Sequence, residues 1–145
     1  MTARQIALAA LFAGMSALPA IAAAADCSVP APGTAERGAI MDPVRAPVAT
    51  ELKQAVEFVA HKFKVCTQGG ESFAFLDAAV QGPGGSAVDW SITPYADADC
   101  SRLVIALLHR QAGQPWAVTE LDVCPTDVPW EVWPEQYHAP AELFR

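Results

Sequence analysis

Three residues in the middle of the chain pair an imidazole with carboxylates: His61, Glu57 and Asp77. Glu57 precedes His61 by four residues, and Asp77 is next to the position that faces His61 on the neighbouring predicted strand. A histidine beside a carboxylate can serve general acid–base catalysis. The same pattern also fits a solvated histidine on a strand edge. We expect no catalytic site, and these three residues are the candidates if one exists.

Aromatic residues in the tail, residues 125–145, are the candidates for ligand binding. Trp130, Trp133 and Tyr137 are spaced by three and four residues, which puts them on one helical face if Asp127 caps a short helix. Such a face can stack on sugar rings or anchor a protein partner. Alternatively, it packs back over the sheet as a lid. The sequence leaves both alternatives open.

Metal and cofactor motifs are incomplete. The four cysteines are separated by 39, 34 and 24 residues, without the close Cys pairs that zinc sites use. The glycine-rich stretch 82–86 lacks the Lys-Ser/Thr ending of a phosphate loop, and Asp97-Ala98-Asp99 begins a calcium loop that does not continue. We therefore expect no metal and no cofactor.

The N-terminus has the pattern of a secretory signal peptide. Arg4 precedes an apolar stretch from Ile6 to Ala24, which ends in small residues up to Ala25. Gly14 and Pro19 interrupt the stretch, which disfavours a transmembrane helix, and Asp26 disfavours lipidation of the following cysteine. We expect a signal peptide over residues 1–25 and a periplasmic or secreted domain over 26–145, with no membrane span after cleavage.

Charge narrows the choice of partner. The net charge is −7, and it becomes −8 when Arg4 is removed with the signal peptide. An acidic chain without a basic cluster does not attract nucleic acid or anionic lipid. The acidity can also serve solubility alone. If the chain has a partner, a cationic periplasmic protein or a glycan is the candidate, and the sequence does not indicate the oligomeric state.

One helix is predicted before the strands. Ile40, Val44, Val48 and Leu52 recur every four residues between residues 35 and 52, and Thr34 is placed to cap the N-terminus. Pro43 and Pro47 each remove a backbone donor. We therefore expect a kinked helix or two shorter pieces.

Four strands are predicted over residues 55–66, 71–81, 102–110 and 115–124, joined pairwise by turns at 67–70 and 111–114. A change of phase in the first strand indicates a β-bulge near His61. Residues 82–101 form a long connection in which 88–93 can supply a short edge strand. The order predicts an α+β domain, with the helix on a four- to five-stranded antiparallel sheet in a cystatin-like or NTF2-like shape.

The cysteines fit one pairing in this topology. A hairpin centred on 111–114 places Cys100 opposite Pro125, next to Cys124. The helix must run back along the sheet before the first strand, which brings Cys27 near Cys66. Exported proteins keep such disulfides oxidised. We expect Cys27–Cys66 and Cys100–Cys124.

Short stretches across most of the mature chain form a pattern: Glu36-Arg37 with Ile40-Met41-Asp42 and Arg45, Val56-Glu57-Phe58-Val59, Phe73-Ala74-Phe75, Ala106-Leu107-Leu108 with Arg110, Trp116-Ala117-Val118, and Thr126-Asp127-Val128 with Trp130. In these stretches the chain resembles a set of small secreted proteins of Gram-negative bacteria without a characterised activity. The resemblance implies a periplasmic α+β domain. Pro43 and the four cysteines depart from that pattern.

Export, small size, disulfides and the lack of a catalytic motif together favour a non-catalytic binding or interaction module. An inhibitor or accessory protein is the sharpest version of this hypothesis. The alternative is a small envelope-acting enzyme with a His–carboxylate centre, for which His61, Glu57 and Asp77 are the residues available.

Overall fold

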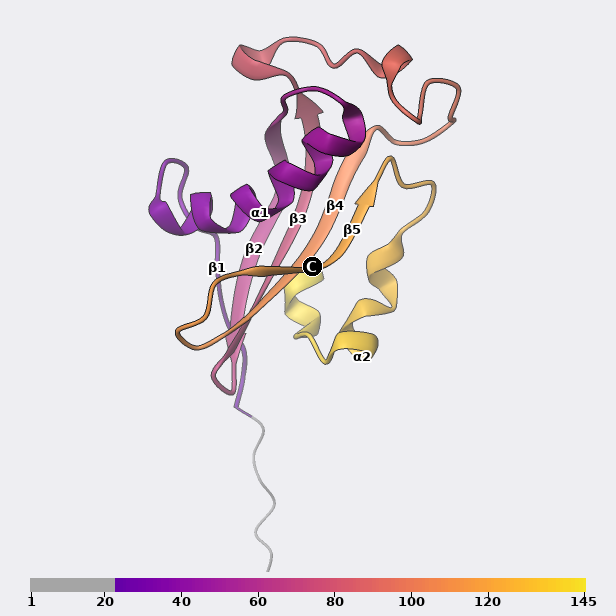
Figure 1. Ribbon diagram of the computed structural model, residues 1–145. Helices are drawn as coiled ribbons and strands as arrows, with labels where there is room; N and C mark the ends of the chain where they lie inside the picture. The colour runs from indigo at the N-terminus through magenta and orange to yellow at the C-terminus, as the bar shows by residue number, and fades with distance from the viewer. Residues whose placement is uncertain (1–22) are drawn as a thin grey trace, which may run out of the picture.

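The computed structural model describes residues 23–145 as an α+β fold with one antiparallel sheet (Figure 1). The predicted signal peptide, residues 1–25, lies outside the described residues except for its last three, and it stays a prediction. The helices and strands are, in chain order, β1 (Asp26–Ser28), α1 (Ala35–Leu52), β2 (Glu57–Gln68), β3 (Glu71–Gln81), β4 (Leu103–Gln111), β5 (Ala117–Val123) and α2 (Trp133–Tyr137). Single turns of 3-10 helix are η1 (Pro83–Gly85), η2 (Trp90–Ile92), η3 (Pro129–Glu131) and η4 (Ala141–Phe144).

The five strands lie in the sheet in the order β1-β2-β3-β4-β5, which is their order in the chain. The four predicted strands are confirmed, and the fifth is β1 at the N-terminal edge. The edge strand expected over 88–93 is wrong. That segment contains η2 instead, because the Asp89 carboxylate accepts the backbone N–H of Ser91 at 3.0 Å and turns the chain.

Helix α1 begins where the sequence predicts. The Thr34 hydroxyl accepts the backbone N–H of Arg37, and Lys53 ends the helix in the left-handed conformation. One continuous helix passes through Pro43 and Pro47, so the alternative of two separate pieces is wrong. A kink at the prolines stays a prediction.

The first core lies between α1 and one face of the sheet. Ile40, Val44, Val48 and Leu52 are fully buried, as their spacing predicted. They belong to one cluster with sheet residues that include Leu76, Ala106 and Leu108.

A second core fills the opposite face of the sheet. Phe73, Phe75, Ile105 and Leu107 point to this face, and Trp133, Leu143 and Phe144 from the tail complete the cluster. The last turn, η4, contacts β2 and β3. Both faces of the sheet are therefore covered, so the tail is part of the domain.

The hairpin registers differ from the predicted ones. The β2–β3 turn is only Gly69-Gly70, both with positive φ, so Cys66 faces Phe73 and not Glu71. In the second hairpin His109 faces Ala117, and a bulge between Leu107 and Leu108 shifts the pairing again.

The two disulfides are the predicted ones, Cys27–Cys66 and Cys100–Cys124, and the described residues contain no free cysteine. Cys27 and Cys66 are register partners in β1 and β2. Next to the second disulfide, the Ser101 backbone N–H donates to the Pro125 carbonyl at 3.2 Å. Within residues 23–145, no helix is long and apolar enough to cross a bilayer.

Candidate functional site

A pocket of about 230 Å³ lies between the sheet and the tail, and we call it the tail pocket. Strands β3, β4 and β5 supply part of its wall, and the end of α2 supplies the rest. Its lining residues are Glu71, Phe73, His109, Thr119, Tyr137 and His138.

Ring packing and polar contacts hold the side chains of the tail pocket in place. The His109 ring packs on Phe73 with centroids 4.8 Å apart, and His109 Nε2 lies 3.6 Å from Glu71 Oε1. The Tyr137 hydroxyl donates to Glu120 and accepts from Gln136 Nε2. Two hydrogen bonds at its hydroxyl therefore hold the Tyr137 ring in the wall of the pocket.

The predicted aromatic face of the tail is divided in the structure. Trp133 is 4% exposed and contacts the Phe75 and Phe144 rings edge-on, so it forms a lid over the sheet. Trp130 is half-buried against Phe75, and Tyr137 lines the tail pocket. Trp130 and Tyr137 are the members of the set that keep exposed surface.

The predicted cap of the tail helix is wrong. Asp127 caps no helix, because η3 follows Val128 without a side-chain cap and α2 begins only at Trp133. Two short turns therefore replace the single helix that the spacing of the aromatic residues suggested.

The bulge in β2 falls at His61, as predicted, because the pairing with β3 shifts between Ala60 and Lys62. His61 Nδ1 lies 3.6 Å from Asp77 Oδ1, which is too long for a hydrogen bond. That Asp77 oxygen is buried without a hydrogen-bond partner among residues 23–145. The structure therefore places His61 next to Asp77 without a hydrogen bond between them.

Glu57 does not join this pair. Four residues along a strand span about 13 Å, so Glu57 lies well away from His61 on β2. Its carboxylate instead accepts a hydrogen bond from Gln81 Nε2 at 3.5 Å.

A second pocket, of about 310 Å³, lies at the outer edge of β2 beside α1, and we call it the edge pocket. It is lined by Val29, Arg37, Ala60, His61, Lys62, Phe63 and Lys64.

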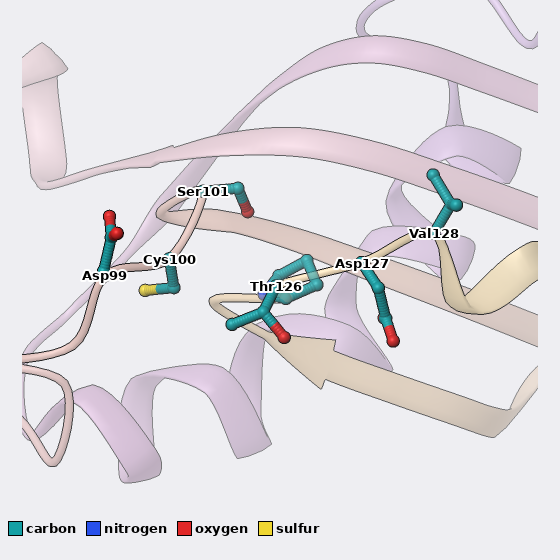
Figure 2. Close-up of a pocket in the computed structure, with 7 residues that line it drawn as sticks. Asp99, Cys100, Ser101, Thr126, Asp127 and Val128 are labelled. Carbon is teal, nitrogen blue, oxygen red and sulfur yellow. The ribbon is translucent and has the colours of Figure 1, made fainter.

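A third pocket, of about 530 Å³, lies beside the Cys100–Cys124 disulfide, and we call it the acidic pocket. Two segments of chain form it, residues 99–101 and 125–128. Figure 2 shows the carboxylates of Asp99 and Asp127 at opposite ends of this pocket, pointing apart.

Carboxylates gather around this end of the sheet. Burial raises the pKa of Asp122, and the charges of Asp127 and Glu51 raise it further. The Tyr95 hydroxyl donates to Glu51, and burial together with that carboxylate raises the pKa of Tyr95. The acidic groups are therefore close enough to repel one another.

The described part of the chain contains no candidate metal site, because no three His, Cys, Asp or Glu residues converge on one point there. The two histidines of the tail pocket, His109 and His138, were not singled out by sequence reasoning. The register of β3 and β4 sets His109 opposite Phe73, and the turn after α2 positions His138.

No family model matches the chain, and searches of curated proteins and of solved structures found no match either.

Proposed function

We propose that the protein is a non-catalytic, periplasmic or secreted binding module, and that the tail pocket is its ligand site. The observation that carries this proposal is the composition of that pocket. Aromatic faces from Phe73 and Tyr137 meet polar groups from Glu71, His109 and Thr119 in one concave site. Apolar walls with a few convergent polar groups are typical of ligand pockets.

The size of the tail pocket suits one ring or one side chain of a larger ligand. Drug-sized ligands occupy sites of roughly 300 Å³ or more, whereas this pocket holds about 230 Å³. A sugar ring of a glycan presents an apolar face and hydroxyl groups, which match the Tyr137 ring and the Glu71 carboxylate. We therefore propose an envelope glycan as the ligand class.

A cationic protein is the second proposed partner, in which case the module acts as an inhibitor or accessory protein. The observation that favours it is the repulsion that Asp122 experiences from Asp127, which lines the acidic pocket, and from Glu51. A cationic surface docked there relieves that repulsion and meets a chain of net charge −8.

Export supports both versions of the proposal. Two disulfides are typical of proteins that work outside the cytoplasm, and the predicted signal peptide over residues 1–25 supplies the route. The position of α1 against one sheet face also supports the cystatin-like or NTF2-like comparison, which is a comparison of shape alone.

Two matched variants test the glycan version. Tyr137→Leu removes the ring from the tail pocket, and Tyr95→Leu removes a ring whose hydroxyl also donates to a glutamate but lies outside that pocket. Soluble peptidoglycan fragments are titrated into each protein, with backbone amide NMR as the readout. We expect shifts at Thr119 and His109 that Tyr137→Leu abolishes and Tyr95→Leu keeps. Equal binding by both variants would refute the tail pocket as the site.

The enzyme alternative is favoured by one observation, the approach of His61 to Asp77 at 3.6 Å. An enzyme of this kind would release soluble fragments from envelope material, and His61→Ala would abolish the release. Glu57→Gln is the control, because Glu57 lies away from the pair. We expect no release that depends on His61.

A further inference from the structure

The edge pocket follows the outer edge of β2 beyond the point where β1 ends. Five consecutive residues of β2, 60–64, line it together with Val29 and Arg37. Successive side chains of a strand point to opposite faces of the sheet, so a pocket lined by five in a row lies along the strand edge and not on one face. The edge pocket therefore lies where a longer β1 would run.

Pro30 explains why β1 is so short. Continued by two residues, the register of β1 and β2 would set Pro30 opposite Phe63. Proline has no N–H to donate to a ladder. The Pro30 carbonyl accepts a hydrogen bond from the Arg37 side chain at 3.0 Å, so it is also directed away from β2. The chain therefore leaves the sheet here, and β2 continues upward without a neighbour on this side.

The main-chain N–H and C=O groups of Phe63 point toward the edge pocket. The Cα atoms of Cys27 and Cys66 are 4.0 Å apart, a short separation that is typical of an antiparallel pair without mutual hydrogen bonds. Cys66 therefore turns its main-chain groups toward β3. Because this direction alternates along a strand, Val65 and Phe63 turn theirs outward. Val65 has Ser28 opposite, whereas no residue of β1 faces Phe63, and within residues 23–145 no turn or loop gives Phe63 a backbone hydrogen bond.

Basic side chains flank this edge on both faces of the sheet. On the α1 face, the Arg37 guanidinium lies over the Phe63 ring at 4.7 Å. On the opposite face, Lys62 and Lys64 donate to main-chain oxygens of the tail. No acidic residue lines the pocket, although the chain as a whole is acidic. A single small anion does not reach both faces, but the side chains of an extended strand alternate between them.

We propose that the outer edge of β2 binds an extended peptide segment with acidic side chains, which joins the sheet as an added strand. Main-chain hydrogen bonds to Phe63 supply the attachment, and the basic residues on the two faces select the acidic side chains. The bulge at His61 interrupts the regular edge, so the bound segment is short.

A second copy of the chain is a poorer occupant of this edge. Two copies that paired through β2 would set lysines and arginines against one another, and lysines and bulges on an edge strand oppose such pairing. The edge of β2 is also separate from the tail pocket. Its test therefore reads other residues than the test of the proposed function, and one can fail without the other.

A capped hexapeptide of alternating threonine and glutamate is the probe. It is titrated into the purified, disulfide-bonded protein, with backbone amide NMR as the readout. We expect saturable shifts at residues 60–64 that include the Phe63 amide. A peptide with lysine in place of glutamate should bind about tenfold more weakly or not at all, because the basic residues repel it. The glutamate peptide with N-methylated main-chain amides should not bind, because it keeps its charge and loses its main-chain donors.

Two variants of the protein match this test. Arg37→Gln should weaken binding of the glutamate peptide about tenfold, because it removes a charge from the α1 face of the edge. Arg102→Gln is the control, since Arg102 also lies over an aromatic ring, Trp90 at 5.1 Å, but outside the pocket. It should bind as the parent protein does.

Several results would overturn the proposal. Equal binding of the N-methylated peptide would mean that charge alone attracts the probe, and equal binding of the lysine peptide would mean that the edge does not select acidic segments. Absent shifts, or shifts away from residues 60–64, would exclude the edge itself. A protein dimer in sedimentation that the peptide dissociates would assign the edge to a second copy instead. If Arg37→Gln lowers the thermal midpoint of unfolding, the three peptides still decide the matter on the parent protein.

Discussion

Cys27 lies directly opposite Cys66 in the antiparallel register of β1 and β2, and their Cα atoms are 4.0 Å apart. Strand β1 has only three residues, and few hydrogen bonds hold so short an edge strand. The disulfide is therefore the main link that holds the N-terminal segment on the sheet.

Loss of this disulfide should destabilise the protein strongly. The bond closes a loop of 39 residues, for which chain entropy predicts a contribution of about 4 kcal/mol. We expect Cys27→Ala with Cys66→Ala to lower the free energy of unfolding in urea by about that amount. Hydrogen exchange should show β1 amides unprotected while β4 stays protected. Peptide mapping that finds Cys66 linked to Cys100 would contradict the topology itself.

Trp133 should behave as a core residue. Its side chain is 4% exposed and packs against Phe75 and Phe144, so Trp133→Ala should cost about 3–5 kcal/mol in urea unfolding. Trp130→Ala is the comparison, because Trp130 is only half-buried and should cost clearly less. A Trp133→Ala protein as stable as its parent would show that the tail does not hold the second core together.

Asp122 should make the folded protein more stable at acidic pH than at neutral pH. Burial, Asp127 and Glu51 raise its pKa above the ordinary value of 3.8, so the folded chain binds the proton more tightly than the unfolded chain. Its contribution to stability is complete below that value and is lost as the pH rises through the raised pKa. At pH 7, Asp122→Asn should therefore raise the thermal midpoint, and this gain should vanish as the pH falls toward 3.8.

Asp97→Asn is the control for Asp122. Asp97 is exposed, and its substitution removes the same charge. It should change the thermal midpoint less, with a weaker dependence on pH. Equal gains in both variants would mean that the general acidity of the chain matters and the site of Asp122 does not.

The mature N-terminus should lie between Ala24 and Cys27 and carry no lipid. Intact mass and N-terminal sequencing of the exported protein measure this directly. A form that keeps Arg4 and remains with the membrane, or an acylated Cys27, would contradict the predicted signal peptide.

Helices and strands whose apolar residues recur at a regular spacing could be predicted from the sequence. The four-residue spacing from Ile40 to Leu52 gave the helix and its buried face, and the change of phase near His61 gave the bulge. The disulfide pairing followed from the position of the second hairpin turn and from the direction in which the helix must run. Strand β1 was missed because three residues beside Pro30 are too few to show an alternation.

The site could not be predicted because it depends on register and on long-range packing. Two glycines with positive φ shortened the first turn and moved the β3 partner of Cys66 by two positions, from Glu71 to Phe73. His109 and His138 are far apart in the chain and meet only when the tail folds over β4. The edge pocket likewise joins residues of α1 and β2 that no motif connects.

The two cores of this sheet are completed at different times during synthesis. Every residue of the cluster under α1 lies before residue 125, whereas the opposite face needs Trp133, Leu143 and Phe144. During synthesis the N-terminal part of the chain emerges first. The core under α1 can therefore form while the opposite face of the sheet, with Phe73, Phe75, Ile105 and Leu107, remains uncovered. Until the last residues emerge, that bare apolar surface is open to self-association, and the final turn, η4, ends this vulnerable stage.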